Sequence, residues 1–211
     1  MTENSAGQFH SYHTAEGHRL PHDPLKAIVA PRPICWVSTI DENGVRNLAP
    51  YSFFNMVNTR PPLVMFSSEG AKDSVQNIRE TGDFTCNLAT MPLSTKMNHT
   101  SADAARHVDE FDLAGIEAAP SAFVRPPRVA ASPASLECRA IEVKQLEDIH
   151  GAQLDTFMVI GQVVMVHIDK RCLVNGYFDI VAAQTISRAG YRGDYVLGDQ
   201  VFEMLRPSDG G

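Results

Sequence analysis

Strand-like segments dominate the hydrophobic pattern of this chain. Residues 34–40 combine β-branched and aromatic side chains, which favour an extended conformation. Residues 41–44 have the composition of a turn and end in Gly44, a residue that adopts a positive φ at little cost. The β-type pattern resumes at Val45. We therefore predict a β-hairpin in this region.

Four further segments carry strand signals. Residues 63–66 are an apolar run after two prolines, and residues 84–88 form a second short run. Residues 134–146 alternate between apolar and polar side chains, and residues 156–168 are rich in β-branched ones, so these two strands are predicted to be the longest. Six or more strands with a few short helices favour a mainly β protein with a closed barrel over a parallel α/β sheet.

Residues 73–82 carry the signals of a short helix. Asp73 stands at the N-cap position, Gln76 three residues later completes a capping box, and Gly82 lies just beyond the end. Helical turns are also predicted at residues 24–28, 91–99 and 101–108.

The chain is predicted to form one domain, because no linker or internal repeat divides it. Residues 1–22 are polar and aperiodic, which predicts a flexible N-terminal arm. Residues 23–205 would form the barrel domain, and residues 206–211 a C-terminal tail. The proline-rich residues 120–133 are interpreted as a loop on the surface of this domain.

Composition and charge exclude several classes of partner. Among 211 residues, 44% are hydrophobic and 20% charged, as in an ordinary globular protein. The 18 Lys and Arg against 25 Asp and Glu give a net charge of −7, so no nucleic-acid partner is expected. The longest weakly polar run, residues 157–168, is shorter than the roughly 20 residues of a membrane-spanning helix. Residues 1–18 resemble no targeting signal, so we expect a cytoplasmic protein.

Cysteine and histidine placement does not predict a metal site. The four cysteines, at positions 35, 86, 138 and 172, lie far apart in strand-like contexts, so we expect buried thiols without disulfides. The histidines at positions 10, 13, 18 and 22 lack accompanying acidic or cysteine ligands and are interpreted as solvated. The chain also lacks the short motifs of Rossmann dinucleotide binding, P-loop phosphoryl transfer, zinc proteolysis and elbow-serine hydrolysis.

An anion-binding site is predicted where a strand meets the helix at residue 73. Residues 67–74 combine hydroxyl groups, a glycine, Lys72 and the unpaired N–H groups of a helix N-terminus, which suits a phosphate. The alternative is a solvated loop before an ordinary capped helix. The first hairpin adds polar and aromatic side chains that could hold a flat, heteroatom-rich ring. These are Ser38, Thr39, Asn47 and Ser52 with Trp36, Tyr51, Phe53 and Phe54.

The order and spacing of several motifs resemble the flavin reductase-like, FMN-binding split-barrel family. The resemblance spans roughly residues 23–195. Its motifs are PRPI at 31–34, WVST at 36–39, NLAPYSFF at 47–54, KDS at 72–74, PPR at 126–128, LEC at 136–138, GQVV at 161–164 and RAGY at 188–191.

The resemblance implies a homodimeric split barrel of the Greek-key type with FMN, rather than FAD, near the subunit interface. It implies that the first hairpin contacts the flavin ring and ribityl chain, and that the segment before the helix binds the phosphate. Arg188 and Tyr191 match a late R-x-G-Y element that approaches flavin or substrate; the alternative is a structural salt bridge and a packed aromatic. The implied cofactor-binding residues are Ser38, Thr39, Asn47, Ser52, Phe53, Ser67, Lys72, Asp73, Ser74, Arg188 and Tyr191.

The resemblance further implies a flavoprotein oxidoreductase with NAD(P)H as electron donor and an oxygenase component or another acceptor. No catalytic acid or nucleophile is expected, because the flavin performs the chemistry. Short NAD(P)H-dependent members resemble one another in a His five residues before the glycine that corresponds to Gly161, where this chain has Thr156. Two alternatives therefore stay open: a flavoredoxin-like FMN carrier that exchanges electrons with a redox partner protein, and a split barrel that serves only in binding.

Overall fold

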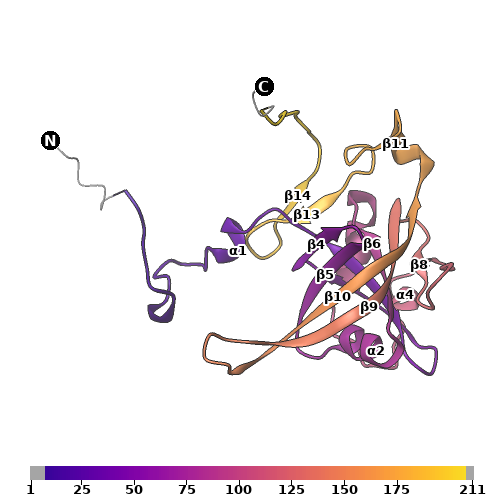
Figure 1. The fold of residues 1–211 in the computed structure, drawn as a ribbon, viewed down its shortest axis with the longest axis horizontal. Coiled ribbons are helices and arrows are strands. Elements are labelled where there is room, and N and C mark those ends of the chain that lie inside the picture. The colour runs from indigo at the N-terminus through magenta and orange to yellow at the C-terminus, as the bar shows by residue number, and fades with distance from the viewer. Residues whose placement is uncertain (1–7, 208–211) are drawn as a thin grey trace.

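The computed structural model describes residues 8–207, and its body is a seven-stranded antiparallel sheet (Figure 1). The strand order is β3-β2-β6-β9-β10-β5-β4. The two edge strands, β3 and β4, are joined by only Ser52 and Phe53, so the sheet must curl until its edges approach each other. The predicted antiparallel barrel is confirmed. Its strands are β2 (Cys35–Ile40), β3 (Arg46–Tyr51), β4 (Phe54–Thr59), β5 (Pro62–Glu69), β6 (Asp83–Leu88), β9 (Ala134–Glu147) and β10 (Gln153–Ile168).

Smaller elements surround the barrel. Three short strands, β1 (Arg32–Pro33), β13 (Ile186–Arg188) and β14 (Tyr195–Leu197), form a second sheet. Two-stranded pairs are β7 (Ala118–Ala119) with β8 (Arg128–Val129) and β11 (Leu173–Val174) with β12 (Tyr177–Phe178). The helices are α1 (Leu25–Ile28), α2 (Asp73–Thr81), α3 (Ser94–His99) and α4 (Glu110–Leu113), with 3-10 turns η2 (Thr14–Glu16), η3 (Met91–Leu93) and η4 (Lys170–Cys172).

Two apolar clusters lie on opposite faces of the sheet. Successive side chains of a strand point to opposite faces, so Cys35 and Val37 join the interior cluster while Ile34 and Trp36 join an outer one. Helix α2 closes one end of the barrel with two apolar side chains of the interior cluster. The outer cluster also contains Leu48, Met97, Phe111, Val129 and Ile186, which come from β3, α3, α4, β8 and β13.

The first hairpin forms where it was predicted. Strands β2 and β3 pair antiparallel from Cys35 opposite Tyr51 to Ile40 opposite Arg46. The turn is held by the Asp41 carboxylate, which accepts the Val45 N–H at 2.8 Å, and Gly44 has a φ of 91°. The strands predicted at 63–66, 84–88, 134–146 and 156–168 are confirmed as parts of β5, β6, β9 and β10.

The helix predictions are confirmed in part. Helix α2 occupies the predicted place and ends at Gly82, whose φ is 76°. Its N-cap is Lys72 rather than Asp73, and the Gln76 amide donates to the Ala71 carbonyl at 2.6 Å instead of forming a capping box. The turns α1 and α3 also form, whereas residues 101–108 are irregular, so the helix predicted there is wrong. Tertiary contacts of Arg106, described below, hold that segment away from a helical path.

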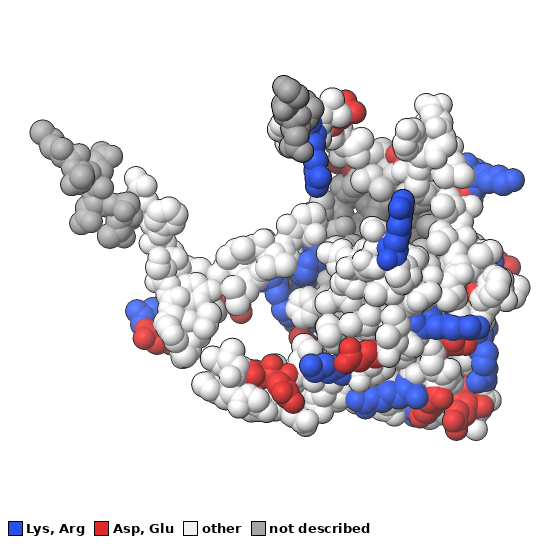
Figure 2. Space-filling model, viewed as in Figure 1, with Lys and Arg blue, Asp and Glu red and all other residues white. Residues whose placement is uncertain are grey.

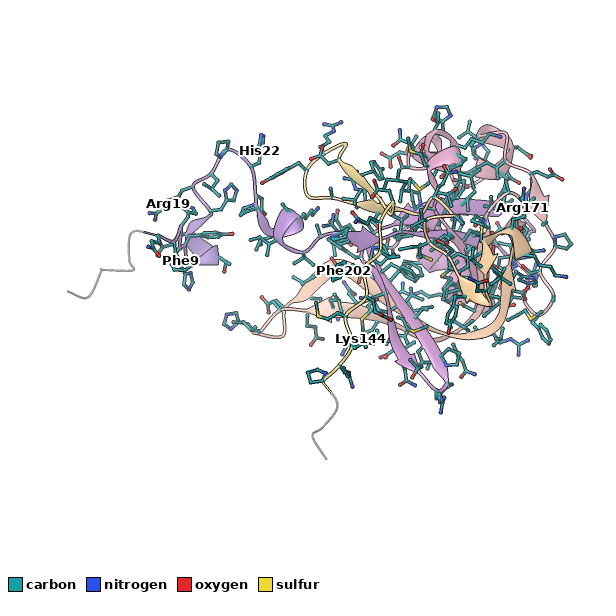
Figure 3. All side chains as sticks on the ribbon, turned by 90° about the horizontal axis from the view of Figure 1, so that it is seen from above. Phe9, Arg19, His22, Lys144, Arg171 and Phe202 are labelled. Carbon is teal, nitrogen blue, oxygen red and sulfur yellow. The ribbon has the colours of Figure 1, made fainter. Side chains whose placement is uncertain are left out.

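The two ends of the described chain extend away from the barrel (Figure 1). Phe9 is 74% exposed and Phe202 is 82% exposed, and Phe9 lies apart from the packed body (Figure 3). Residues 1–7 of the predicted arm and 208–211 of the predicted tail lie outside the described residues. All four cysteines are buried, as expected. Between residues 8 and 207, no helix is long and apolar enough to cross a membrane.

Candidate functional site

Three of the cavities near the corner where β3 passes into β4 adjoin one another. The cradle cavity, of about 220 Å³, lies against the N-terminus of α2 and is lined by Asn47, Tyr51, Lys72, Asp73, Ser74, residues 100–104 and Glu110 among others. The corner cavity, of about 190 Å³, is lined by Lys26, Arg32, Tyr51, Ser52, Phe53, Ser67, Glu69, Lys72 and Arg188. The arginine cavity, of about 500 Å³, is lined by Ile34, Pro50, Ser52, Met97, Asn98, Ser101, Arg188, Arg192, Gly193 and Tyr195.

The three cavities share wall residues, so they adjoin one another. Tyr51 and Lys72 line both the cradle and the corner cavities. Ser52 and Arg188 line both the corner and the arginine cavities. An elongated ligand with a charged end and a flat ring could therefore pass from the helix N-terminus to the barrel corner.

The junction between β5 and α2 is shorter than the sequence indicated. Strand β5 continues through Glu69, so Ser67 belongs to a paired strand and not to a loop. Gly70 makes the bend with a φ of 81°, and its N–H donates to the Asp155 carbonyl at 2.9 Å. Lys72 follows as the N-cap, and no side chain caps the first turn of α2. The first-turn N–H groups therefore lack a side-chain acceptor, and the Lys72 side chain lies between two cavities.

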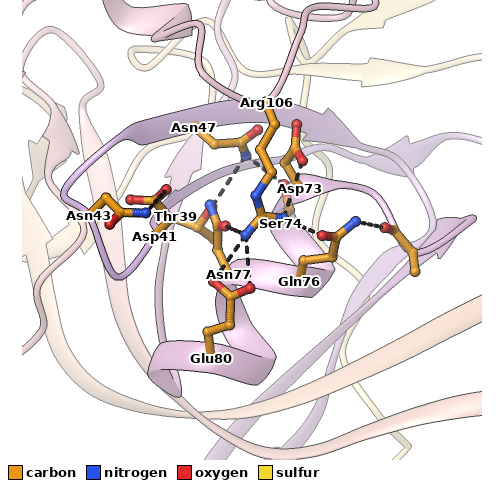
Figure 4. A network of polar contacts seen from close by, with 11 residues as sticks. Thr39, Asp41, Asn43, Asn47, Asp73, Ser74, Gln76, Asn77, Glu80 and Arg106 are labelled. Atoms are coloured by element: carbon orange, nitrogen blue, oxygen red, sulfur yellow. Dashed lines mark hydrogen bonds and ion pairs between the residues drawn. The ribbon is translucent and has the colours of Figure 1, made fainter.

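A network of buried amide and hydroxyl side chains holds part of the wall of the cradle cavity in place (Figure 4). The Asn47 amide donates to Ser74 Oγ at 2.8 Å and to Thr39 Oγ1 at 3.3 Å. The Asn77 amide donates to the same Thr39 oxygen at 3.1 Å. Because these side chains are buried and bonded to one another, they fix the position of the helix N-terminus relative to β2 and β3.

Arg106 anchors the segment that covers the cradle cavity (Figure 4). Its guanidinium donates to both Glu80 oxygens at 2.8 and 3.0 Å and lies 3.6 Å from an Asp73 oxygen. It also bonds Gln76. These contacts tie residues 100–104, which line the cavity, to helix α2, and they replace the local helix that was predicted there.

The corner cavity concentrates positive charge in an acidic protein. Four of its lining side chains are Lys or Arg, and its one carboxylate, Glu69, lies 3.9 Å from Lys26. Blue side chains gather in Figure 2 where the N-terminal segment joins the barrel. Lys26 Nζ and Arg32 Cζ lie 5.6 and 5.8 Å from the ring centroid of Phe53. This balance of charge favours an anionic ligand.

Arg32 is a buried cation without a carboxylate partner among residues 8–207. It is 6% exposed; its guanidinium donates to the carbonyl oxygens of Lys26, Val29 and Ala189, and its Nε has no partner. Burial and then the nearby Arg188 charge lower the pKa of Arg32. A buried charge without a counter-charge is costly, so an anion in the corner cavity would stabilise it.

Most of the predicted site residues come together here. Asn47, Asp73 and Ser74 line the cradle cavity, Ser52, Phe53, Ser67 and Arg188 line the corner cavity, and Lys72 lines both. Ser38 and Thr39 are fully buried and line none of the three cavities. Tyr191 also lies outside them, with its ring 5.9 Å from that of His22. Lys26, Arg32 and Arg192 were not predicted.

Thr156, the position that departs from the family pattern, borders the same junction. It is half-buried on β10 and pairs with Glu69 on β5. Its neighbour Asp155 accepts the Gly70 N–H. The departure therefore lies beside the bend that leads to Lys72.

Comparisons with known proteins agree with this geometry. The family model described as flavin reductase like domain matches residues 29–179. An uncharacterized protein of Deinococcus radiodurans is 36% identical over 194 residues, covering 86% of this chain and 82% of that protein. Nitrilotriacetate monooxygenase component B from Bacillus cereus is similar in structure, with a TM-score of 0.83, 26% identity, and coverage of 92% of this chain and 98% of that one. A protein with a split barrel domain from Shewanella frigidimarina has a TM-score of 0.78 at 22% identity, covering 93% and 100% of the two chains.

Proposed function

The chain belongs to the flavin reductase-like domain family, and from this premise we propose that it is an FMN-dependent oxidoreductase. The flavin would lie along the corner and cradle cavities. The observation that carries the proposal is Arg32, a buried cation that lacks a carboxylate partner within the described chain and faces a cavity with Lys72 and Arg188. The electron-rich ring of a flavin in the corner cavity would face this cation, while its phosphate would lie in the adjoining cradle cavity.

The residues present fit the two ends of FMN. Lys72, Ser74 and the first-turn N–H groups of α2 would hold the phosphate, because a helix N-terminus and a cation favour a dianion. Ser52, Phe53, Ser67 and Asn47 would contact the ring and ribityl chain. Ser38 and Thr39 would act from behind the cavity wall, where Thr39 holds the amide of Asn47.

A bound flavin supplies hydride and electron transfer, and the protein supplies position and electrostatics. The locked Asn47 and Ser74 side chains would orient the ligand without reorganisation. Arg32 and Arg188 would stabilise negative charge placed in the corner cavity. The segment held by Arg106 would exclude water from the phosphate end.

We propose NAD(P)H as the electron donor, with reduced flavin passed to an oxygenase component or another acceptor. The structural neighbour from Bacillus cereus, a monooxygenase component B, supports an oxygenase partner.

Thr156 favours a second candidate, a flavoredoxin-like carrier reduced by a partner protein, because the His of short NAD(P)H-dependent relatives is missing beside the cradle. Anaerobic mixing with NADH and NADPH separates the two: loss of the flavin absorption within seconds indicates the reductase, and reduction by dithionite alone indicates the carrier.

The proposed assembly is a homodimer. Exposed apolar side chains lie on both extended ends of the described chain, including Phe9 at one end and Phe202, Met204 and Leu205 at the other. A second copy would cover them. Light scattering after gel filtration should give twice the 23.1 kDa chain mass. A monomeric mass at micromolar concentration would contradict this part of the proposal.

The cofactor is tested by spectroscopy of the purified protein. We expect flavin absorption bands on isolation or after reconstitution with FMN, and weaker binding of FAD. A colourless protein that takes up neither nucleotide would reject the flavin proposal and favour a binding or interaction module.

A further inference from the structure

The arginine cavity differs from the two cavities assigned to FMN. It is the largest of the three, at about 500 Å³, and lies between α3 and the turn that joins β13 to β14. Ile34, Pro50 and Met97 provide apolar walls. It meets the corner cavity at Ser52 and Arg188, so a molecule bound in it would adjoin the ring end of the proposed flavin site.

The charged lining of this cavity is entirely positive. Arg188 and Arg192 line it, and none of its lining residues is Asp or Glu. No ion pair with an acidic side chain of residues 8–207 occupies either guanidinium. Arg188 is positioned by Tyr195, with its Cζ 4.7 Å from the ring centroid. The Asn98 side chain adds an amide to the same wall.

These features define a ligand class. A guanidinium binds a carboxylate or a phosphate through paired N–H donors. Since neither Arg188 nor Arg192 has an acidic partner among residues 8–207, both guanidiniums can bind such a group. The apolar wall suits a ring or a short carbon skeleton, and the volume suits a small molecule rather than a peptide. A small organic anion therefore fits better than a neutral compound.

We propose that the arginine cavity binds the anionic group, carboxylate or phosphate, of the small organic molecule that exchanges electrons with the flavin. Arg192 provides the selection for charge, because it lines this cavity and neither of the other two. This substrate role rests on the proposed FMN function, but anion binding by the cavity does not.

The test compares three probes of similar size on the FMN-loaded protein by calorimetry: benzoate, phenyl phosphate and benzamide. We expect benzoate, phenyl phosphate or both to bind at least about tenfold more tightly than benzamide, which is neutral. Arg192→Gln should weaken anion binding by about tenfold, the scale of one charged hydrogen bond. Lys144→Gln, which removes an exposed charge on β9, is the matched control and should change nothing.

The outcomes separate this inference from the FMN proposal. Equal binding of benzamide and benzoate, or unchanged binding in Arg192→Gln, would overturn the inference even if FMN binds. If FMN does not bind, the same titrations on the flavin-free protein still test the cavity. Binding of phenyl phosphate alone would support it and identify the anion as a phosphate, in which case NADPH should compete. Binding of benzoate alone would support it and identify an organic acid.

Discussion

The Nε2 atom of His167 lies 2.6 Å from Oε1 of Glu137, a carboxylate with no exposed surface. Glu137 also accepts the backbone N–H groups of Ala122 at 2.7 Å and Phe123 at 2.6 Å. It therefore fastens the proline-rich loop to strands β9 and β10. All three donors converge on one buried side chain, so a single charge holds Ala122 and Phe123 of the loop in place.

Replacing this charge should destabilise the fold. In Glu137→Gln, an amide NH2 replaces one acceptor oxygen, so at least one donor loses its partner. We expect a loss of about 1.5–3 kcal/mol in the free energy of unfolding, the range for hydrogen bonds to charged groups. Urea denaturation measures the loss, and Glu142→Gln, at an exposed position of the same strand, serves as the control. Equal stability of the two variants would show that Glu137 does not anchor the loop.

The same side chain should make stability depend on acid pH. Burial raises the pKa of Glu137, but hydrogen bonds from Ala122, His167 and Phe123 outweigh it, so the pKa lies below its usual 4.5. The ionised form thus stabilises the fold above pH 4.5, and this contribution is lost as the pH falls through the lower folded-state pKa. Urea titrations at several pH values below 5 should show a steeper fall for the native chain than for Glu137→Gln. Parallel curves would argue against the assignment.

Gly161 occupies a position where no side chain fits. A Cβ built on it would lie 2.4 Å from Cζ of Phe84, which is fully buried in the barrel. Gly161→Ala should therefore cost about 1–3 kcal/mol of stability through overpacking. Thermal unfolding measures this, with Gln162→Ala as the exposed neighbour for comparison.

A second substitution distinguishes a clash from a backbone effect. In the double variant Gly161→Ala, Phe84→Leu, a smaller side chain replaces the aromatic ring. The double variant should therefore lose less free energy of unfolding than the sum of the two single variants. Strict additivity would mean that the two side chains do not collide.

The sequence predicted those elements whose conformation is determined by residues close to them in the chain. The hairpin at Gly44 and the helix end at Gly82 were predictable because positive φ angles at those glycines are local properties. Strand β4 was missed because it is an edge strand whose residues are mostly exposed, so it has no apolar alternation. Its pairing with β5 decides its conformation, and that is a long-range property.

The cradle cavity of the candidate site was predictable from the sequence, and the charged corner cavity was not. Lys72 and Ser74 adjoin a helix start that the sequence displays. The burial of Arg32 has no local signal, because its guanidinium also donates to the carbonyl of Ala189, which is far away in the sequence. The wrong helix at 101–108 has the same cause, since Arg106 bonds α2 instead of its own segment.

Lys72 should distinguish ligands by their phosphate. If its ammonium group binds the FMN phosphate, Lys72→Ala should weaken FMN binding by about 1.5–3 kcal/mol, roughly a 10- to 150-fold rise in Kd. Riboflavin, which has the same ring without the phosphate, should lose little affinity. Fluorescence titration measures both ligands, and Lys170→Ala, an exposed lysine in η4, is the control. Equal losses for FMN and riboflavin would place Lys72 at the ring, and the phosphate would then belong in the corner cavity beside Arg32.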